Sequence, residues 1–239
     1  MAKQLGIYER VEGCDGAGKT TQMGHLKQYS QEKGIDALFI REPGASSLGE
    51  KVRAIVLANE TGDLDPAAEF TLFTADRIQT YHQIIAPALA EDRLVISDRG
   101  VESTVCYQSA TGHLSAEVIM DISRKLLPLR YMQPDVLALL SITKEVRRQR
   151  LNKRFEHTAA DRMELKGESY DDRVYAAYQD LSKLDYVTTI DGNRDEEQVF
   201  EDLKPVIFGK YMRDHSGIFL PTYTKYDAPV TEDTSVQPK

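Results

Sequence analysis

The sequence predicts an α/β fold in which a parallel sheet of about five strands is flanked by helices. Two observations lead to this prediction. Short apolar runs alternate along the chain with longer helix-like stretches, as strands and crossover helices do in parallel sheets. A glycine-rich turn also separates the first apolar run from the first helix-like stretch. The strand candidates are residues 5–11, 37–40, 94–97, 136–140 and 186–190.

The glycine-rich turn has the G-x-x-x-x-G-K-[ST] pattern of a phosphate-binding loop. It reads Gly13-Cys14-Asp15-Gly16-Ala17-Gly18-Lys19-Thr20 and is followed by Thr21. A strand before it and a helix over residues 21–32 supply the context that such a loop requires. Its glycines let backbone N–H groups point at phosphate oxygens, assisted by the helix dipole. Lys19 is expected to reach the β- and γ-phosphates, and the Thr20 hydroxyl to bind Mg²⁺, which indicates a P-loop NTPase fold.

Two helices can be placed from their sequence signals. Residues 66–89 carry apolar residues at helical spacing, with Pro66 near the start, where a helix tolerates proline. Pro87 is expected to break or kink this helix. The second helix should run from Thr143, a suitable N-cap, to Arg154. Beyond about residue 211 the periodicity is lost, so we expect one domain over residues 1–210 and a solvated C-terminal extension or tail over residues 211–239.

The third strand candidate ends in an acid followed by an arginine. The carboxyl ends of parallel strands meet the ligand crevice, so Asp98 is placed to hold Mg²⁺ through water, as the second acidic element of P-loop enzymes does. Arg99 could be no more than a salt-bridge partner of that acid. Beside a phosphate loop, its planar fork is better suited to a second phosphate group.

A basic helix face precedes a polar loop. Arg147, Arg150 and Arg154 fall at i, i+3 and i+7, and such a face is ordinarily solvated. The polar residues 155–162 that follow suit a loop that closes over ATP, excludes water and stabilises the transferring phosphoryl group. The pattern alone leaves both interpretations open, and it marks residues 154–168 as the lid candidate.

Composition restricts the partners. The chain has 239 residues, 30 basic and 38 acidic, with a net charge of −8, so no nucleic acid polymer is expected to bind. Cys14 and Cys106 are too few for a disulfide framework or a zinc site, which indicates a reducing compartment. No apolar run reaches membrane-spanning length, and the first residues lack the apolar core of a secretion signal. A cytoplasmic protein without a membrane partner is therefore expected.

Separated blocks of the chain match the motifs of a known family. They are residues 12–22 with an acid two positions after the first glycine, Arg-Glu-Pro-Gly at 41–44 with its continuation at 48–53, Phe-Thr-Ala-Asp-Arg at 73–77, Asp98-Arg99 with residues 103–108, and residues 161–164 with 170–174. In these blocks the chain resembles the bacterial-type branch of the thymidylate kinases, up to about residue 208. The Arg-Glu-Pro-Gly block makes the resemblance specific.

The resemblance implies roles for the matching residues of an acceptor site. Asp15 would hold the sugar 3′-hydroxyl, and Arg53 and Arg99 would grip the acceptor monophosphate. Phe73 would stack on the pyrimidine, although a packed core position is the competing interpretation, and Arg77 would hydrogen-bond its O4. The remaining implied acceptor-site residues are Glu42 and Pro43 of the Arg-Glu-Pro-Gly block, and Ser103, Thr104 and Gln108, with Tyr107 crowding the 2′ position.

The family resemblance also implies the reaction. ATP with Mg²⁺ would phosphorylate a deoxypyrimidine 5′-monophosphate, dTMP to dTDP, within a homodimer. The phosphate loop has Gly16 where the other branch has arginine, so the lid would supply the missing cation, Arg162 first and Arg154 next. Lys19, Asp15, Arg99 and Arg162 are thus the predicted catalytic residues. Small-molecule nucleotides would be the only ligands.

Some positions depart from the family pattern and keep alternatives open. Gly100 stands where the family usually has an aromatic residue or histidine, Ser141 replaces an expected aspartate, and residues 45–47 are not glycine-rich. A C5-modified dUMP or another nucleoside monophosphate is the alternative acceptor, since Gly100 would remove bulk near the acceptor. An ATP-sensing switch protein is the non-enzyme alternative. Arg53, Arg77 and Arg99 argue against the switch, because they imply a second anionic ligand.

Overall fold

The computed structural model describes residues 6–216 and contains one five-stranded parallel sheet. The strands are β1 (Ile7–Glu12), β2 (Ala37–Arg41), β3 (Leu94–Asp98), β4 (Val136–Ser141) and β5 (Val187–Asp191). They are arranged in the order β2-β3-β1-β4-β5, and every neighbouring pair is parallel. The predicted fold class is confirmed, with all five strand candidates within two residues of their predicted ends.

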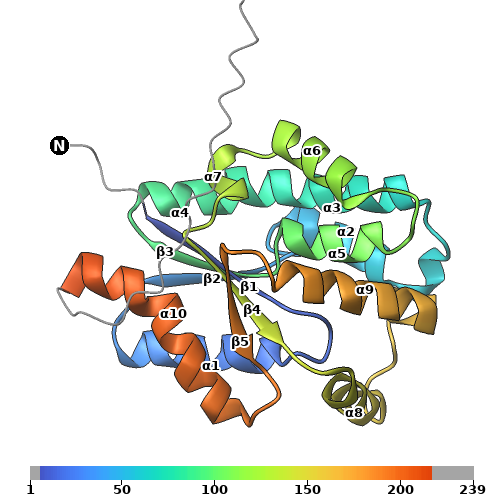
Figure 1. Cartoon of the computed structure of the whole chain (residues 1–239). Helices are drawn as coiled ribbons and strands as arrows, with labels where there is room; N and C mark the ends of the chain where they lie inside the picture. The colour runs from blue at the N-terminus through green and yellow to red at the C-terminus, as the bar shows by residue number, and fades with distance from the viewer. Residues whose placement is uncertain (1–5, 217–239) are drawn as a thin grey trace, which may run out of the picture.

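Helices cover both faces of the sheet (Figure 1). α1 (Lys19–Glu32) and α10 (Glu196–Ser216) pack together on one face. The opposite face carries α3 (Pro66–Thr80), α4 (Ala86–Ala90), α5 (Val101–Ser109) and α9 (Glu168–Leu181), with α2 (Ser47–Leu57) against α3 and α6 (Ala116–Leu126) against α5. The remaining elements are α7 (Leu129–Met132), α8 (Lys144–Phe155) and the short turns η1 (Asn59–Thr61), η2 (Tyr81–Ile85) and η3 (Glu164–Lys166).

The helix predicted over residues 66–89 is extended through Pro87 by a change of helix type. Asp65 caps its start by accepting from the N–H groups of Ala67 and Ala68. Ahead of Pro87 the chain widens into the π-helical turn η2 and then continues as α4. Proline donates no N–H and crowds the carbonyl four residues earlier, so the wider turn accommodates it without ending the helical segment.

The predicted start of the C-terminal tail is too early. α10 continues through Ser216, and its last turns are held by Lys210–Asp214 at 2.9 Å and by His215 stacked on Tyr211 with ring centroids 4.1 Å apart. Residues 211–216 are therefore helical, whereas the rest of the predicted tail lies outside the described residues. No helix within residues 6–216 is long and apolar enough to span a membrane.

The central strand β1 has a different environment on each side. Ile7 and Val11 belong to the larger apolar core shared with α1 and α10. Tyr8, which alternates with them, belongs to a second core with α4 and α7. All six residues of β1 are buried, including Arg10 and Glu12, so the strand carries charged side chains into the interior beneath the loops that follow it.

Candidate active site

A cavity of about 410 Å³ opens at the carboxyl ends of the strands. It is bounded by the loop between β1 and α1, the segment after β2, helices α2, α3, α5 and α8, and the turn after β3. Of the predicted site residues, those that line it are Asp15, Gly16, Gly18, Lys19, Thr20, Thr21, Glu42, Pro43, Arg53, Phe73, Arg77, Asp98, Arg99, Ser103, Thr104, Tyr107, Gln108 and Arg154. Residues remote in sequence thus line one cavity.

The loop at residues 13–18 has the backbone that a phosphate cradle requires. Gly13, Gly16 and Gly18 have φ of 149°, 85° and 91°, a region that other residues rarely adopt. A Cβ on Gly13 would lie 2.8 Å from the carbonyl oxygen of Leu140, so the loop also packs tightly against the end of β4. α1 begins at Lys19, directly after the loop, and its N-terminus faces the cavity. Buried Lys19 donates from Nζ to the carbonyls of Gly13 at 2.6 Å and Cys14 at 3.1 Å.

Asp15 and Arg99 form an ion pair inside the cavity. Arg99 Nη2 lies 2.5 Å from Asp15 Oδ1, and the Tyr107 hydroxyl donates to Oδ2 at 2.5 Å. Burial alone would raise the pKa of Asp15, but the charges of Arg99 and Lys19 lower that pKa well below its usual value. Asp15 is therefore ionised and fixed, with a hydroxyl and a guanidinium group on either side.

Arg99 is held in an unusual backbone conformation. Its φ is +78°, in the left-handed region that few non-glycine residues occupy. Its side chain donates to Ser103 Oγ at 3.1 Å and to the Tyr178 hydroxyl at 3.3 Å, in addition to Asp15. Burial lowers the pKa of Arg99, but nearby Tyr107 and Asp15 more than offset this and raise it well above the usual value. Such strain often accompanies a side chain that must face a ligand.

Arg77 lies deeper in the cavity and is almost fully buried. It donates to Thr104 Oγ1 at 2.5 Å and to the Gly100 carbonyl at 2.6 Å. Its Nε is 3.3 Å from a carboxylate oxygen of Glu42, and its guanidinium carbon lies 5.8 Å from the centre of the Phe73 ring. Phe73 also packs against Val52 and Val56 in a small core. Phe73 is therefore part of this small core and also lines the cavity.

Glu42 is a buried carboxylate with incomplete hydrogen bonding. The Tyr131 hydroxyl donates to Oε2 at 2.5 Å, while Oε1 has no partner among the described residues. Burial raises the pKa of Glu42 to about 7, although the Arg77 charge opposes the shift. Arg53 lines the same cavity and donates to the Pro43 carbonyl at 3.2 Å.

Arg162 does not lie where a lid arginine was expected. It is 6% exposed and does not line the cavity. Its Nε donates to the Val56 carbonyl at 2.9 Å, and Nη2 pairs with the fully buried Glu69. Lys166 contacts the same carboxylate at 2.9 Å. Arg162 thus links the lid segment to α2 through the Val56 carbonyl and to α3 through Glu69. Because its guanidinium group is paired with Glu69, its charge is not directed at the cavity.

Two arginines of α8 also line the cavity near the phosphate loop. Arg150 donates to the Gly16 carbonyl at 3.4 Å and to the Arg194 carbonyl at 3.3 Å. Arg154 lines the cavity and pairs with Glu164 of η3. Arg147, on the same helix face, is buried against Asp171 and the Asp15 carbonyl. The helical spacing that the sequence displays is the signal from which Arg150 could have been chosen.

Glu12 is a site residue to which the sequence assigned no role. It is fully buried, and its carboxylate accepts from the N–H groups of Gly100 and Ser103 at 2.7 and 3.1 Å, and from the Ser103 hydroxyl at 2.9 Å. Tyr178 also donates to it at 3.1 Å. Glu12 thus links β1 to the first turn of α5, which carries acceptor-wall residues.

Gly100 does not enlarge the cavity. A Cβ at this position would lie 2.6 Å from Cδ of Arg10. The volume that glycine leaves is therefore occupied by an arginine side chain from β1. The expectation that Gly100 removes bulk beside the acceptor is wrong for this reason.

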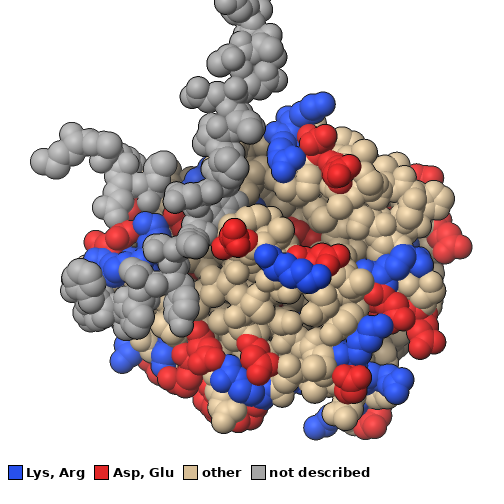
Figure 2. Space-filling model, viewed as in Figure 1, with Lys and Arg blue, Asp and Glu red and all other residues tan. Residues whose placement is uncertain are grey.

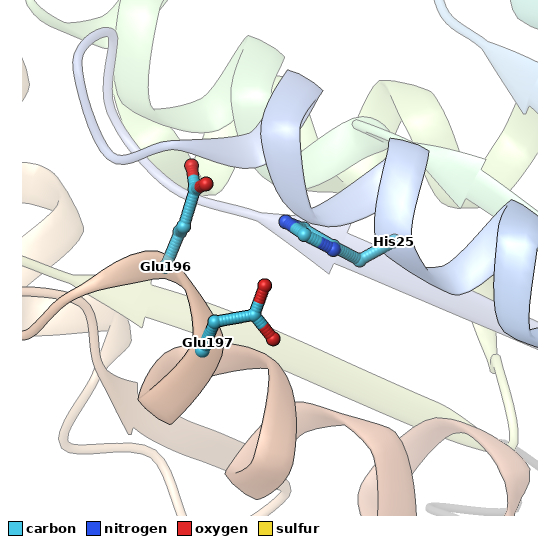
Figure 3. A group of neighbouring side chains, drawn as sticks. All are labelled: His25, Glu196 and Glu197. Carbon is cyan, nitrogen blue, oxygen red and sulfur yellow. The ribbon is translucent and has the colours of Figure 1, made fainter.

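A group of potential metal ligands lies away from the cavity, between α1 and α10 (Figure 3). The ligand atoms of His25, Glu196 and Glu197 are within 4.8 Å of one another. The two glutamates are exposed and form the first turn of α10, where negative charge is favoured by the helix dipole. Their position in the helix explains them without an ion.

The surface charges are mixed. Figure 2 shows lysine and arginine side chains interspersed with acidic ones over the visible face, with no continuous basic area.

Comparison with known proteins gives one family. The family described as Thymidylate kinase matches residues 11–203. The thymidylate kinase of Thermosipho africanus is 34% identical over 202 residues, covering 84% of this chain and 97% of that protein. Those of Mesoplasma florum and Clavibacter sepedonicus are 31% and 36% identical, over 85% and 74% of this chain and 96% and 82% of their own lengths. The chain belongs to the thymidylate kinase family and is a nucleoside monophosphate kinase.

Proposed function

We propose that this protein transfers the γ-phosphoryl group of ATP to dTMP and forms dTDP and ADP. The observation that best supports the proposal is one cavity with two kinds of wall. The phosphate loop and Lys19 form the first wall, and Arg53, Phe73 and Arg77 belong to the second. The names of the similar proteins favour thymidylate as the acceptor.

ATP would lie with its β- and γ-phosphates against the N–H groups of the phosphate loop. Lys19 now bonds two neutral carbonyl groups, and a triphosphate would offer it charged acceptors, which form stronger hydrogen bonds. Arg150 and Arg154 on α8 line the same part of the cavity. Their guanidinium groups would neutralise charge on the transferring group, a role for which Arg162 is too deeply buried in its pair with Glu69.

The residues around Thr20 and Asp98 fit a magnesium ion. Both line the cavity, and Asp98 Oδ1 is buried without a hydrogen-bond partner among the described residues. An unpartnered carboxylate oxygen beside a phosphate loop is suited to a hydrated divalent cation. Mg²⁺ would supply charge neutralisation on the β- and γ-phosphates, with Thr20 as a direct ligand and Asp98 acting through water.

The acceptor nucleotide would occupy the second wall. Arg53 and Arg99 would hold its monophosphate, and Phe73 would stack on the base, whose O4 would accept from Arg77. Tyr107, fixed by its bond to Asp15, would stand where a ribose 2′-hydroxyl has to fit. Ser103, Thr104, Gln108, Glu42 and Pro43 complete the lining. This assignment gives Arg53, Arg77 and Arg99 an anionic ligand of their own beside the donor triphosphate.

The reaction needs positioning and charge neutralisation more than proton transfer. A nucleoside monophosphate has a second pKa of about 6, so its attacking oxygen is already ionised at neutral pH. The two nucleotides must approach in line although both are polyanions. Lys19, Arg99, Arg150 and Arg154 line the cavity in which the two nucleotides would meet. No general base is assigned.

The test is a panel of acceptors with ATP and Mg²⁺, in which ADP and the nucleoside diphosphate are both quantified. The panel contains dTMP, dUMP, C5-substituted deoxyuridylates, the ribonucleotide of thymine, dCMP and dGMP. We expect the highest kcat/KM with dTMP and a large loss with the ribonucleotide. ADP formation without a phosphorylated acceptor would contradict the proposal, as would a preference for a purine nucleotide.

The homodimer implied by the family resemblance is also part of this proposal. Light scattering coupled to size exclusion of the purified chain measures it directly. A monomer at micromolar concentration would contradict it.

A further inference from the structure

β1 carries a fully buried arginine in the middle of the sheet. Arg10 is 0% exposed, and β1 has β3 and β4 on its two sides. Burying a guanidinium group is costly unless its charge and its N–H groups are satisfied. A hydrophobic residue would fill the interior of a central strand at no such cost. The arginine therefore requires a reason beyond packing.

Each nitrogen of the Arg10 guanidinium group has a hydrogen-bond partner. Its Nη1 lies 2.8 and 2.9 Å from the two carboxylate oxygens of Glu102, its Nε donates to the Tyr8 hydroxyl at 3.1 Å, and its Nη2 donates to the Tyr131 carbonyl. The guanidinium carbon also stands 4.3 Å from the centre of the Tyr131 ring. The group is thus fixed from several sides and presents a rigid surface to the next residue in contact with it.

That residue is Gly100. A Cβ built on it would lie 2.6 Å from Arg10 Cδ, 2.8 Å from Arg10 Nε and 2.9 Å from a Glu102 oxygen. The φ of Gly100 is −157°, an extended conformation that any residue can adopt. The backbone therefore does not require glycine here. Contact with the Arg10–Glu102 pair is what excludes a side chain.

Gly100 connects this buried pair to two arginines of the acceptor wall, Arg99 and Arg77. It directly follows Arg99, whose strained φ of +78° aims its side chain at Asp15. Its carbonyl accepts from Arg77 at 2.6 Å. A shift of the turn at residues 98–100 would therefore move one guanidinium group through the chain and the other through a hydrogen bond.

A second path leads from Arg10 to Arg77. Tyr131, whose carbonyl and ring both contact Arg10, donates its hydroxyl to Glu42 at 2.5 Å. Glu42 in turn pairs with Arg77 at 3.3 Å. Arg77 is thus linked to Arg10 on two sides, through Gly100 on one and through Glu42 and Tyr131 on the other.

We infer that Arg10 is a positioning residue: its pair with Glu102, packed against Gly100, fixes the turn that presents Arg99 and orients Arg77. The inference rests on the proposed function in so far as these two arginines contact the acceptor nucleotide. If the inference is right, the residue types at positions 10 and 100 depend on each other: with Arg10 present, position 100 has no room for a side chain. Arg10 itself touches no substrate.

The test is a double-variant cycle between positions 10 and 100. Four proteins are compared: the wild type, Gly100→Ala, Arg10→Val/Glu102→Gln, and the protein with all three substitutions. Glu102→Gln prevents an unpaired carboxylate when Arg10 is removed. The control is Arg130→Met, which breaks a pair with Asp135 beyond the amino-terminal end of β1.

A positioning role predicts strong coupling in acceptor kinetics. Gly100→Ala alone should lower kcat/KM for the acceptor about 100-fold, through a higher KM and a lower kcat, because small displacements of positioning groups have effects of that order. Where Arg10 and Glu102 are already replaced, adding Gly100→Ala should change kcat/KM by no more than about threefold. Arg130→Met should lower the melting temperature and leave the acceptor KM unchanged.

The inference is overturned if Gly100→Ala costs the same factor in both backgrounds, or if Arg10→Val/Glu102→Gln keeps wild-type KM and kcat. Should that background fail to fold, Arg10→Lys is measured, which keeps a cation opposite Glu102 without the planar fork. A raised acceptor KM in this variant supports positioning, and unchanged constants overturn it. All kinetics use the monophosphate that the wild type prefers, so an acceptor other than dTMP contradicts the proposed function and leaves this test intact.

Discussion

Arg154 and Arg162 both belong to the segment between β4 and α9, yet their guanidinium groups have different surroundings. Arg154 is exposed and lines the cavity, whereas Arg162 is buried against Glu69. The sequence favoured Arg162 because it stands in the motif that resembles the lid. The position of Arg162 in the motif does not reveal that it forms an ion pair with Glu69, ninety-three residues earlier. Such pairing depends on tertiary contacts and can only be seen in the folded chain.

Arg162 is expected to contribute to stability more than to turnover. Among the described residues, Arg162→Met leaves the buried Glu69 with Lys166 as its one cationic partner, so the free energy of unfolding should fall by about 3 kcal/mol. Arg150→Ala should instead lower kcat by about 100-fold or more, because it removes a charge beside the phosphate loop. Urea unfolding and steady-state kinetics of both variants measure the contrast. If the Arg162→Met protein is fully folded and its kcat is nevertheless much lower, Arg162 contributes to the reaction and this prediction is wrong.

Glu42 should make stability depend on pH near neutrality. Its pKa is raised from 4.5 to about 7 in the folded protein, chiefly by burial. The folded state therefore binds the proton more tightly, and this stabilisation is complete below about pH 4.5 and is lost as the pH rises through about 7. Relative to Glu42→Gln, which cannot ionise, the ligand-free wild type should lose about 2 kcal/mol between about pH 5.5 and about pH 8.5.

Urea unfolding of both proteins at the two pH values measures this difference. Glu50→Gln, on the exposed side of α2, is the matched control and should show no such pH dependence relative to the wild type. A constant difference between wild type and Glu42→Gln would show that Glu42 is ionised throughout.

At the scale of elements, α5 begins without a cap from its own sequence. Gly100 occupies the N-cap position and offers no side chain, while α6 and α8 are capped locally by Ser115 and Thr143. Glu12, at the end of β1, accepts the free N–H groups of Gly100 and Ser103 instead. A distant carboxylate thus does the work of a cap and places α5 relative to the phosphate loop.

Loss of this carboxylate should loosen the start of α5. Glu12→Ala is expected to lower the free energy of unfolding by about 3 kcal/mol, because several buried donors lose their acceptor. Removal of an ordinary cap by Ser115→Ala should cost only about 1 kcal/mol. Hydrogen exchange of the Ser103 amide should accelerate in Glu12→Ala and not in Ser115→Ala. Unchanged protection at Ser103 would contradict the capping role.

The strands and helices were easier to predict from the sequence than the buried contacts that hold them in place. The five strands are short apolar runs, and Thr143 signals the start of α8, so local pattern was sufficient. The π-turn before Pro87 and the helical residues 211–216 were missed, because packing against neighbours rather than local periodicity stabilises them. Glu12 and Arg10 were missed for the same reason, since a charged residue in a buried strand is explained only by partners remote in sequence.

At the scale of the whole molecule, the cavity joins the two predicted ligand walls. Segments that follow β1, β2 and β3 meet there with α2, α3, α5 and α8, and each supplies at least one lining residue. The Asp15–Arg99 pair connects the phosphate loop to the acceptor wall. If two nucleotides occupy this space at once, their phosphates must lie next to each other between Lys19 and Arg99.

A bridged ligand tests this arrangement directly. Adenosine and thymidine joined through their 5′ positions by a chain of five phosphates should bind with Mg²⁺ more tightly than dTMP or a nonhydrolysable ATP analogue. Any ligand specific for the folded state stabilises it by about 2.7 kcal/mol at one hundred times its Kd, so thermal shifts at equal concentrations rank the three affinities.

Lys19→Ala should abolish the thermal shift caused by the ATP analogue and keep the shift caused by dTMP. Phe73→Leu should do the reverse, because its ring lines only the acceptor wall.

The decisive observation is competition. With the bridged compound bound, saturating dTMP should add no further shift, and neither should the ATP analogue, because one molecule fills both walls of a cavity of about 410 Å³. An additional shift with dTMP would mean that the acceptor binds elsewhere. In that case the wall that carries Arg53, Arg77 and Arg99 would not be the acceptor site.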